Sequence, residues 1–307
     1  MKNPKVSVVL GSYNRLPFIK LTLASIRREV AHMPHEIIIV DGGSTDGTLA
    51  WLCEQKDVIT IVQHNRGVWA GKEIERRSWG YFMNLAFKAA QGEYVCMISD
   101  DCVFVPGALK NGCAYFDQQR EAGNKLGALA FYWREWSREE SYHVGCTLGE
   151  KLYVNHGMFL NSALKEIGYI DEETFFFYNG DGDLCLKLWQ AGYKVFDAPD
   201  SYVEHYPHAN VDVRKTNYQK MKDDLNRYLA KWEGVYYDAK LNNLGKIISK
   251  IYEDPTNTGA CFDFLHQEVL EKHPQVVKGK SLPAKALERL TWKYRGALRK
   301  INALFGR

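Results

Sequence analysis

The sequence predicts an α/β protein in which helices cover both faces of a mixed, mainly parallel, Rossmann-like sheet. Two observations support this fold class. Apolar strand-like runs alternate with helical patterns through the first hundred residues, and these runs are nearly continuous, as in strands buried on both faces. A chain of 307 residues is long enough for one large domain of this kind and an appendage, or for two modest domains.

The apolar patterns define each element in chain order. The predicted strands of the first hundred residues are 6–10, 36–40, 58–63 and 94–98. The predicted helices are 16–30, a second helix that begins at about 45–48, and 81–90. The middle of the chain adds strands at 126–133, 157–160 and 193–196, with a helix at 183–191 that ends at Gly192. Because the first strands end in polar residues, we expect the ligand site beyond their carboxyl ends.

After about residue 206 the pattern becomes wholly helical. The predicted helices there are 217–232, 241–252, 261–272 and 284–305. We therefore expect an α/β domain over 1–210 and a helical C-terminal extension over 211–307.

The composition excludes several other classes of protein. With 46% hydrophobic and 25% charged residues, the chain is neither disordered nor fibrous. No stretch approaches the roughly 18 apolar residues that would cross a bilayer, and the N-terminus has no signal-peptide pattern. The seven scattered cysteines form no CxxC pair, which favours reduced thiols over a zinc finger or a disulfide scaffold. We therefore expect a cytoplasmic protein.

Positive charge is concentrated at the C-terminus. From residue 278 onward there are nine Lys or Arg and one Glu, whereas the preceding chain has 31 basic and 36 acidic residues. This distribution does not indicate a nucleic-acid partner. The amphipathic pattern at 284–305 predicts a basic helix that either lies on an anionic membrane surface, as a peripheral protein of the inner membrane face, or packs on the body or a partner subunit.

Two acidic sites follow the second and fourth predicted strands. Asp100 and Asp101 are adjacent carboxylates that would repel each other unless they share a cation such as Mg²⁺ or Mn²⁺. A solvated turn is the alternative interpretation. Asp41 and Asp46 flank a Gly-Gly-Ser-Thr turn in which an acidic group can accept hydrogen bonds from a nucleoside. Thr45 or Asp46 also fits the N-cap of the next helix.

A third acidic site and a histidine come later in the chain. Asp181 has a glycine on each side, which leaves its carboxylate uncovered, as a general base requires. Asp183 fits the cap of the helix that follows. His205 is either a metal ligand or a structural histidine, and His208 lies close to it in the sequence. A basic cluster either neutralises a diphosphate or is a solvated loop: Lys72, Arg76 and Arg77.

Taken together, these sites resemble the family 2 glycosyltransferases of the GT-A fold over residues 5–210. Residues 6–15 (VSVVLGSYNR) resemble the family's opening SVVIPTYNR, and residues 36–48 (EIIIVDGGSTDGT) resemble its segment EIIVVDNGSTDGT. Residues 84–101 resemble the stretch that runs into the DxD-type motif. Residues 175–193 (FFFYNGDGDLCLKLWQAGY) resemble FFYFEDVDLCLRLRRAGY.

The resemblance implies a nucleotide-diphosphate sugar donor and an inverting, metal-assisted transfer to a hydroxyl of a glycan or lipid-linked glycan acceptor. It implies Asp181 as the catalytic base, and Asp101 and His205 as ligands of Mn²⁺ or Mg²⁺. The residues that would hold the donor nucleotide are Ser12, Tyr13, Asn14, Arg15, Asp41, Asn84 and Asp100.

Three features depart from the family pattern. Gly180 replaces the usual Glu before the base, which alters hydrogen bonding on the acceptor side. Cys102 follows the two carboxylates where a third acid is usual, so Asp101 is the safer metal ligand. The segment 68–80 is longer than expected, and we expect it to shape the sugar pocket.

Two other functions compete with this interpretation. A catalytically degenerate GT-A protein could act as a binding or scaffold subunit, and Gly180 gives this alternative some support. A sugar nucleotidyltransferase has a similar sheet, but it needs a glycine-rich phosphate loop that residues 11–14 do not provide. The chain also lacks the membrane spans and the QxxRW-like motif of a processive synthase.

Overall fold

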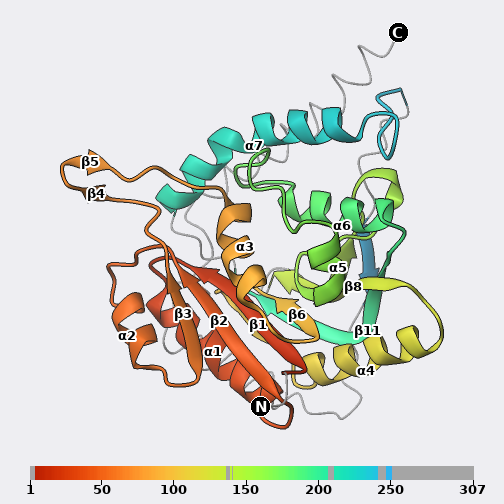
Figure 1. Cartoon of the computed structure of the whole chain (residues 1–307), viewed down its shortest axis with the longest axis horizontal. Coiled ribbons are helices and arrows are strands. Elements are labelled where there is room, and N and C mark those ends of the chain that lie inside the picture. Colours follow the sequence, from red (N-terminus) through yellow and green to blue (C-terminus); the bar gives the residue numbers. More distant parts are fainter. Residues whose placement is uncertain (1–3, 136–138, 140, 207–210, 241–246, 251–307) are drawn as a thin grey trace.

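The computed structural model describes residues 4–135, 139, 141–206, 211–240 and 247–250. These residues form a curled, mixed β-sheet with helices on both faces (Figure 1). The first half contains β1 Val6–Ser12, α1 Leu16–Val30, β2 His35–Asp41, α2 Thr48–Glu54, β3 Val58–Val62, β4 Val68–Trp69, β5 Lys72–Glu73, α3 Trp79–Ala89, β6 Tyr94–Met97, β7 Cys102–Phe104 and α4 Ala108–Glu121. The second half contains β8 Leu126–Glu135, β9 Tyr142–Gly145, a 3₁₀ turn at Leu148–Glu150, β10 Gly157–Leu160, α5 Asn161–Glu166, α6 Gly180–Gln190, β11 Lys194–His205, α7 Val211–Trp232 and β12 Ile247–Lys250.

The main sheet has the strand order β12-β9-β8-β10-β6-β1-β2-β3, and β11 pairs with β7 and β8. The four strands β6, β1, β2 and β3 are parallel to one another. Strand β10 is antiparallel to β6 and begins where β6 ends, because Gly157 pairs with Met97. The segment that leads into β10 therefore lies at the same sheet edge as the residues that follow β6.

Alternate residues of the parallel strands enter two hydrophobic cores. On one face, Val8 and Ile37 contact a core shared with α1 and α4. On the other face, Val9 and Ile38 contact a core shared with α3 and α6. Burial on both sides explains why these strands read as continuous apolar runs.

Two elements extend beyond the sheet and the helices that cover its faces. Strands β4 and β5 form a small hairpin that projects from the body, and α7 runs across the molecule beside α6 (Figure 1). Val68 and Trp69 at the hairpin are 65% and 79% exposed. No helix in the described residues is both long and apolar enough to cross a membrane.

The structure confirms the predicted fold class and most of the predicted elements. Predicted helix 16–30 and strand 157–160 are reproduced with the same bounds, and strand 193–196 is the start of the longer β11. The helix predicted at 241–252 is wrong where the chain is described, since 247–250 is the strand β12. The pattern also missed β7, α4 and β9. The helices predicted at 261–272 and 284–305 lie outside the described residues, as does His208.

Candidate active site

Side-chain hydrogen bonds join the loops that follow β1 and β2. The Asp41 carboxylate accepts the backbone N–H groups of Gly43 and Ser44 at 2.9 and 2.7 Å, and the Ser44 hydroxyl at 2.7 Å. The Ser44 hydroxyl accepts the backbone N–H of Asn14 at 2.8 Å, and the Asn14 side chain accepts the N–H of Thr45 at 2.8 Å. Asp41 is fully buried, so its carboxylate shapes one loop and, through Ser44, holds the other against it.

The other predicted residues of the first loop lie beside this network. Ser12 is buried and pairs with Asp41 in the parallel ladder between β1 and β2. The guanidinium of Arg66 lies 5.3 Å from the centroid of the Tyr13 ring. The loop residues predicted to hold the nucleotide are therefore together at one edge of the sheet.

The start of α2 differs slightly from the prediction. Gly47, with φ 95°, occupies the N-cap position that the sequence assigned to Thr45 or Asp46. Asp46 nevertheless accepts the N–H of Thr48 at 3.0 Å and, with its other oxygen, the N–H of Leu16 at 3.1 Å. It therefore connects the starts of α1 and α2.

The two carboxylates after β6 have opposite pKa shifts. Burial raises the pKa of Asp100 to about 6; Arg15 opposes this shift and the charge of Asp101 adds to it. Burial also disfavours the charged form of Asp101, but the charges of His205 and Arg15 outweigh it and hold the pKa of Asp101 well below its usual range. Arg15 Nη1 lies 3.2 Å from Asp101 Oδ2. Of the two carboxyl groups, Asp101 is thus the one that ionises more readily.

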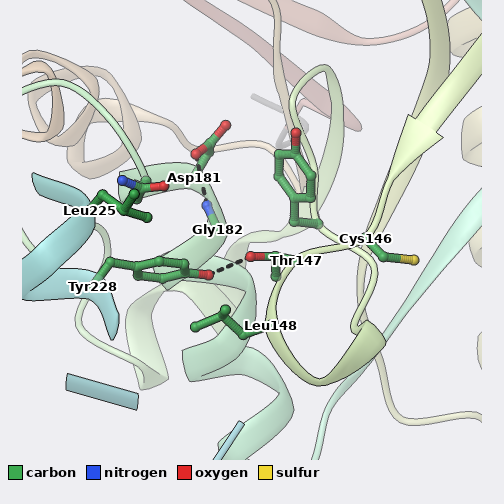
Figure 2. Close-up of a pocket in the computed structure, with 9 residues that line it drawn as sticks. Cys146, Thr147, Leu148, Asp181, Gly182, Leu225 and Tyr228 are labelled. Atoms are coloured by element: carbon green, nitrogen blue, oxygen red, sulfur yellow. Dashed lines mark hydrogen bonds between the residues drawn. The ribbon is translucent and has the colours of Figure 1, made fainter. Parts of the chain in front are cut away.

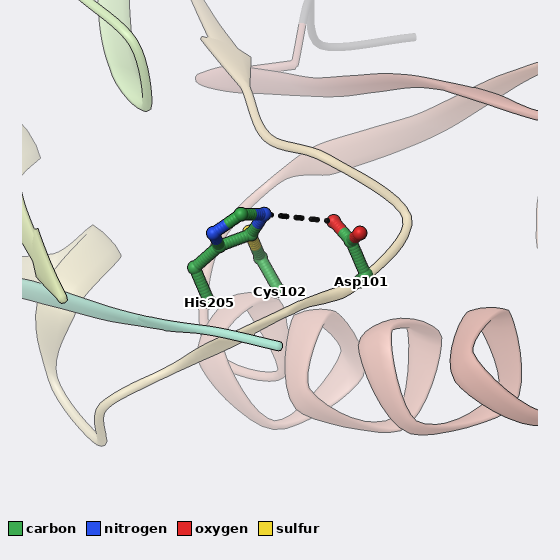
Figure 3. A group of neighbouring side chains, drawn as sticks. All are labelled: Asp101, Cys102 and His205. Atoms are coloured by element: carbon green, nitrogen blue, oxygen red, sulfur yellow. Dashed lines mark ion pairs between the residues drawn. The ribbon is translucent and has the colours of Figure 1, made fainter. Parts of the chain in front are cut away.

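A candidate metal site forms where β7 and β11 pair (Figure 3). His205 Nε2 lies 3.4 Å from Asp101 Oδ1. His205 is opposite Cys102 in the antiparallel ladder, which explains how a residue about a hundred positions away reaches Asp101. One potential ligand atom from each of these three side chains lies within 4.8 Å of the other two.

The donor set fits a hard or borderline divalent cation. Carboxylate oxygen and imidazole nitrogen suit Mn²⁺, and the carboxylate suits Mg²⁺. Burial and the nearby Asp101 charge raise the pKa of the Cys102 thiol well above its usual range, so this group stays protonated. Asp101 and His205 are therefore the two side chains suited to hold a metal.

Asp181 lies in the wall of a cavity of about 360 Å³ (Figure 2). The lining residues come from the segment after β9, the start of α6, and α7: Cys146, Thr147, Leu148, Tyr153, Asn179, Asp181, Gly182, Leu225 and Tyr228. The hydroxyls of Thr147 and Tyr228 lie 2.5 Å apart in this wall. Asp181 accepts the N–H of Gly182 at 2.8 Å and the Asn155 amide at 3.3 Å.

The electrostatics of Asp181 suit a proton acceptor. Burial raises the pKa of its carboxyl group, and the hydrogen bonds from Gly182 and Asn155 only partly oppose this shift. A carboxylate with a raised pKa is a stronger base than a free one. Its position in the first turn of α6 also favours the charged form.

Two consecutive residues connect the Asp181 cavity to the metal site. Asn155 donates to Asp181, while the ring of His156 lies 3.7 Å from the Cys102 sulfur and 5.7 Å from the centroid of the His205 ring. Burial lowers the pKa of His156 to about 3, so the ring is neutral. The two sites predicted from distant parts of the sequence are therefore neighbours at one edge of the sheet.

Helix α7 fixes the segment that carries Asp181. Asp224, only 1% exposed, accepts the backbone N–H groups of Phe176, Phe177 and Tyr178, each at 2.9 Å. Because α7 also lines the cavity, the boundary predicted at residue 210 does not separate this helix from the site.

Asp183 does not cap α6, contrary to the prediction. Its side chain makes no capping hydrogen bond, and Asn179, with φ 64°, occupies the N-cap position. The Asp183 carboxylate instead contacts Lys231 at 2.8 Å and the Trp232 indole N–H at 2.9 Å. These two contacts pair the buried carboxylate with polar groups of α7, and they attach α7 to α6.

Asn84 lies apart from the other residues predicted to hold the nucleotide. It is buried in α3, donates to the Ile170 carbonyl at 2.9 Å and to the Glu172 carboxylate at 2.5 Å, and accepts the N–H of Ile170 at 3.0 Å. Its amide thus holds the segment before α6 in place.

The structure shows the surroundings of two of the departures from the family pattern, Gly180 and the segment 68–80. A Cβ on Gly180 would lie 3.2 Å from the Trp79 ring, so an indole fills the space beside the position where the family has Glu. The hairpin of the long segment 68–80 projects outward, whereas Arg76 at its base donates to Asn217 of α7 at 3.0 Å. Arg77 is exposed and pairs with Glu75 at 3.6 Å.

Several residues at or beside the cavity were not predicted from the sequence. Thr147 and Tyr228 line the cavity, and Asn155 donates to Asp181. Thr147 and Asn155 lie in an irregular segment, and Tyr228 lies on a helix that has no motif. For Tyr228, the apolar spacing with Leu225 and Trp232 was a usable signal, because it places all three on one side of a helix. Nothing comparable indicates Thr147 or Asn155.

Comparisons with known proteins give matches to one family and to one fold. The family model described as Glycosyl transferase family 2 matches residues 7–178, more than half of the chain. Protein CgeD of Bacillus subtilis is 27% identical over 203 residues, which cover 62% of this chain and 45% of that protein. The chain therefore spans less than half the length of this relative.

Solved structures share the fold. A mannosyltransferase from Pyrobaculum calidifontis in complex with GDP-Man and Mn²⁺ has a TM-score of 0.53 and 20% identity, with 100% of this chain and 84% of that chain covered. Residues 1–349 of S. aureus TarS in complex with UDP-GlcNAc have a TM-score of 0.51 and 16% identity, covering 87% and 73% of the two chains. The fold of the described chain is therefore GT-A.

Proposed function

This chain belongs to glycosyl transferase family 2, and on that premise we propose that it transfers a sugar from a nucleotide-diphosphate sugar to a glycan hydroxyl with inversion. The observation that carries the proposal is the adjacency of two sites. A proton-accepting carboxylate, Asp181, lies next to a carboxylate–imidazole pair suited to a divalent cation. The solved neighbours that bind GDP-Man or UDP-GlcNAc support a donor of the same chemical class.

On the donor side, the loops after β1 and β2 would bind the nucleotide, and Asp101 with His205 would hold Mn²⁺ or Mg²⁺ against its diphosphate. A divalent cation in this place supplies charge neutralisation for the leaving diphosphate. Arg15, which already contacts Asp101, adds a fixed positive charge close to the same point.

On the acceptor side, Asp181 would take the proton of the attacking hydroxyl as its oxygen bonds to the anomeric carbon. The bond from that carbon to the diphosphate breaks, and the diphosphate leaves with the electron pair. Asn155 and the Gly182 N–H orient the carboxylate for this role. The cavity of about 360 Å³ beside this carboxylate would hold the acceptor in line with the donor.

Replacement of Asp181 distinguishes an effect on catalysis from an effect on donor binding. We expect Asp181→Asn to reduce release of nucleoside diphosphate from UDP-GlcNAc or GDP-mannose with Mn²⁺ by about 10²–10⁴-fold. The rise in melting temperature on donor binding should persist, because Asp181 is on the acceptor side. Asp57→Asn, a surface carboxylate paired with Arg27, is the matched control and should behave as wild type.

Two results would contradict the proposal. Near wild-type release by Asp181→Asn would show that another group is the base. Donor binding by the wild-type chain without any release would favour the degenerate binding or scaffold subunit.

A further inference from the structure

We propose that the acceptor is an oligosaccharide longer than one sugar, and that an aromatic strip formed by Phe177, Tyr178 and Tyr218 binds its distal residues. The proposal rests on the function proposed above, since it extends from the Asp181 cavity. It concerns residues outside the donor site and outside the cavity itself.

The strip begins at the cavity. Asn179 and Leu225 line the cavity wall, and Tyr178 directly precedes Asn179 in the chain. Leu225 and Tyr218 are seven residues apart on α7, so they lie on the same side of the helix, about 10 Å apart along its axis. Tyr178 and Tyr218 stack on each other, with ring centroids 6.1 Å apart and planes at 23°.

The strip is accessible to a ligand. Phe177, Tyr218 and Leu225 are 38%, 44% and 37% exposed, in contrast to the buried Tyr228 at 3%. Phe177 lies edge-on to Tyr178, with centroids 5.0 Å apart. A continuous set of exposed aromatic side chains at a cavity mouth is typical of a binding surface.

The strip is also rigid. The carboxylate of Asp224 holds the backbone of Phe177 and Tyr178 with hydrogen bonds of 2.9 Å. The Arg76 guanidinium lies 4.9 Å from the centroid of the adjacent Phe176 ring and donates to Asn217, one residue before Tyr218. Fixed aromatic groups bind with little loss of conformational entropy.

The chemistry of a sugar fits this surface. One face of a pyranose carries C–H groups that pack on aromatic rings, while its hydroxyls bond to groups at the ring edges, such as tyrosine hydroxyls. The cavity is at the small end of the usual range for ligand sites, roughly 300–1,000 Å³, so the distal sugars of a longer glycan that reacts at Asp181 would extend beyond it. The aromatic strip lies beside the cavity, where these distal sugars would emerge.

Glycan binding by the full chain tests the proposal without knowledge of the acceptor. The probe is an array of linear oligosaccharides of increasing length. We expect the wild-type signal to rise with length, and Tyr218→Ala to weaken binding of the longer oligomers about tenfold. Tyr218→Phe keeps the ring and should retain most of the binding. Trp69→Ala removes an exposed aromatic from the β4–β5 hairpin and should have no effect.

Several outcomes would overturn the proposal. These are a wild-type signal that does not depend on length, equal binding by wild type and Tyr218→Ala, or conversion of a wild-type dimer to a monomer by Tyr218→Ala. The last result would assign the strip to a second copy of the chain. Donor-induced melting shifts, measured in the same variants, report on the donor site separately, so failure of the glycan proposal is distinguishable from failure of the proposed transfer.

Discussion

At the scale of single residues, the environment of Asp181 sets the strength of the proposed base. Burial raises the pKa of its carboxyl group, while the N–H of Gly182 and the amide of Asn155 stabilise the charged form and limit the rise. The balance between these effects is open to measurement, because the Asn155 side chain can be removed without removing the carboxylate.

The pH dependence of transfer follows from this balance. Since the carboxylate is the active form, the rate should fall as the pH decreases through the raised pKa of Asp181. Asn155→Ala removes a donor to the charged form and should move this acidic limb to higher pH. A pH–rate profile of kcat/KM for the two proteins checks the direction, and an unchanged or opposite displacement would contradict the role of Asn155.

Residues were predictable where they follow regular elements. Asp101 and His205 each lie at the end of a strand run, and the resemblance to a known family added their pairing. Asp183 was misinterpreted because its partners, Lys231 and Trp232, lie on a helix whose docking the local sequence does not reveal. Asn155 and His156 lie in an irregular segment, where no periodicity indicates which side chains point to the site.

At the scale of elements, ion pairs and hydrogen bonds attach α7 to the catalytic body. Lys231 contacts both Asp171 and Asp183, at 2.8 Å in each case. Although burial opposes it, the hydrogen bonds from Lys231 and Thr174 lower the pKa of Asp171 to about 2. The attachment of α7 is therefore expected to depend on pH.

The sign of this dependence is fixed by the lowered pKa. The stabilisation by Asp171 is fully present above its ordinary pKa of 3.8 and is lost as the pH falls towards 2. The shift corresponds to about 2 kcal/mol, and solvent screening of the partly exposed pair reduces this to about 1 kcal/mol. Asp171→Asn should therefore unfold at lower urea concentration than wild type at pH 7, with a gap that narrows below pH 4.

The matched control for this measurement is Asp223→Asn, on the exposed side of α7, which should unfold like wild type. A gap between Asp171→Asn and wild type that is the same at every pH would show that the ion pair does not cause it.

Elements were predictable where burial imposes a pattern. The parallel strands and α1 are apolar on the faces that enter the two cores, and their predicted bounds agree with the structure within one or two residues. Helix α4 was missed although Leu109, Cys113 and Phe116 are buried at helical spacing, because most of its other residues are polar or small. Strand β12 pairs with β9, a contact that the local sequence of 247–250 does not encode.

At the scale of the whole molecule, the metal site joins parts of the chain that are distant in sequence. Asp101 follows β6, and His205 ends β11. A cation held by both would stabilise only the folded chain, because the unfolded chain does not bring the two ligands together.

Addition of Mn²⁺ should therefore raise the melting temperature. Binding at a hundredfold excess over Kd contributes about 2.7 kcal/mol, which corresponds to about 4 °C for a chain of this size. The comparison in each protein is between Mn²⁺ and EDTA, so the intrinsic effect of a substitution cancels. Asp101→Asn should lose the shift and Asp57→Asn should keep it; a full shift in Asp101→Asn would place the metal elsewhere.

The direct succession of Asn155 and His156 has a consequence for how the chain tolerates change. One side chain serves the carboxylate of the cavity and the other lies against Cys102, with about 3.8 Å between their Cα atoms. No residue lies between Asn155 and His156 that could absorb a displacement of the backbone. An insertion or deletion of a single residue at this point would displace one side chain from its partner, so natural length variation in this stretch belongs on either side of the pair and not within it.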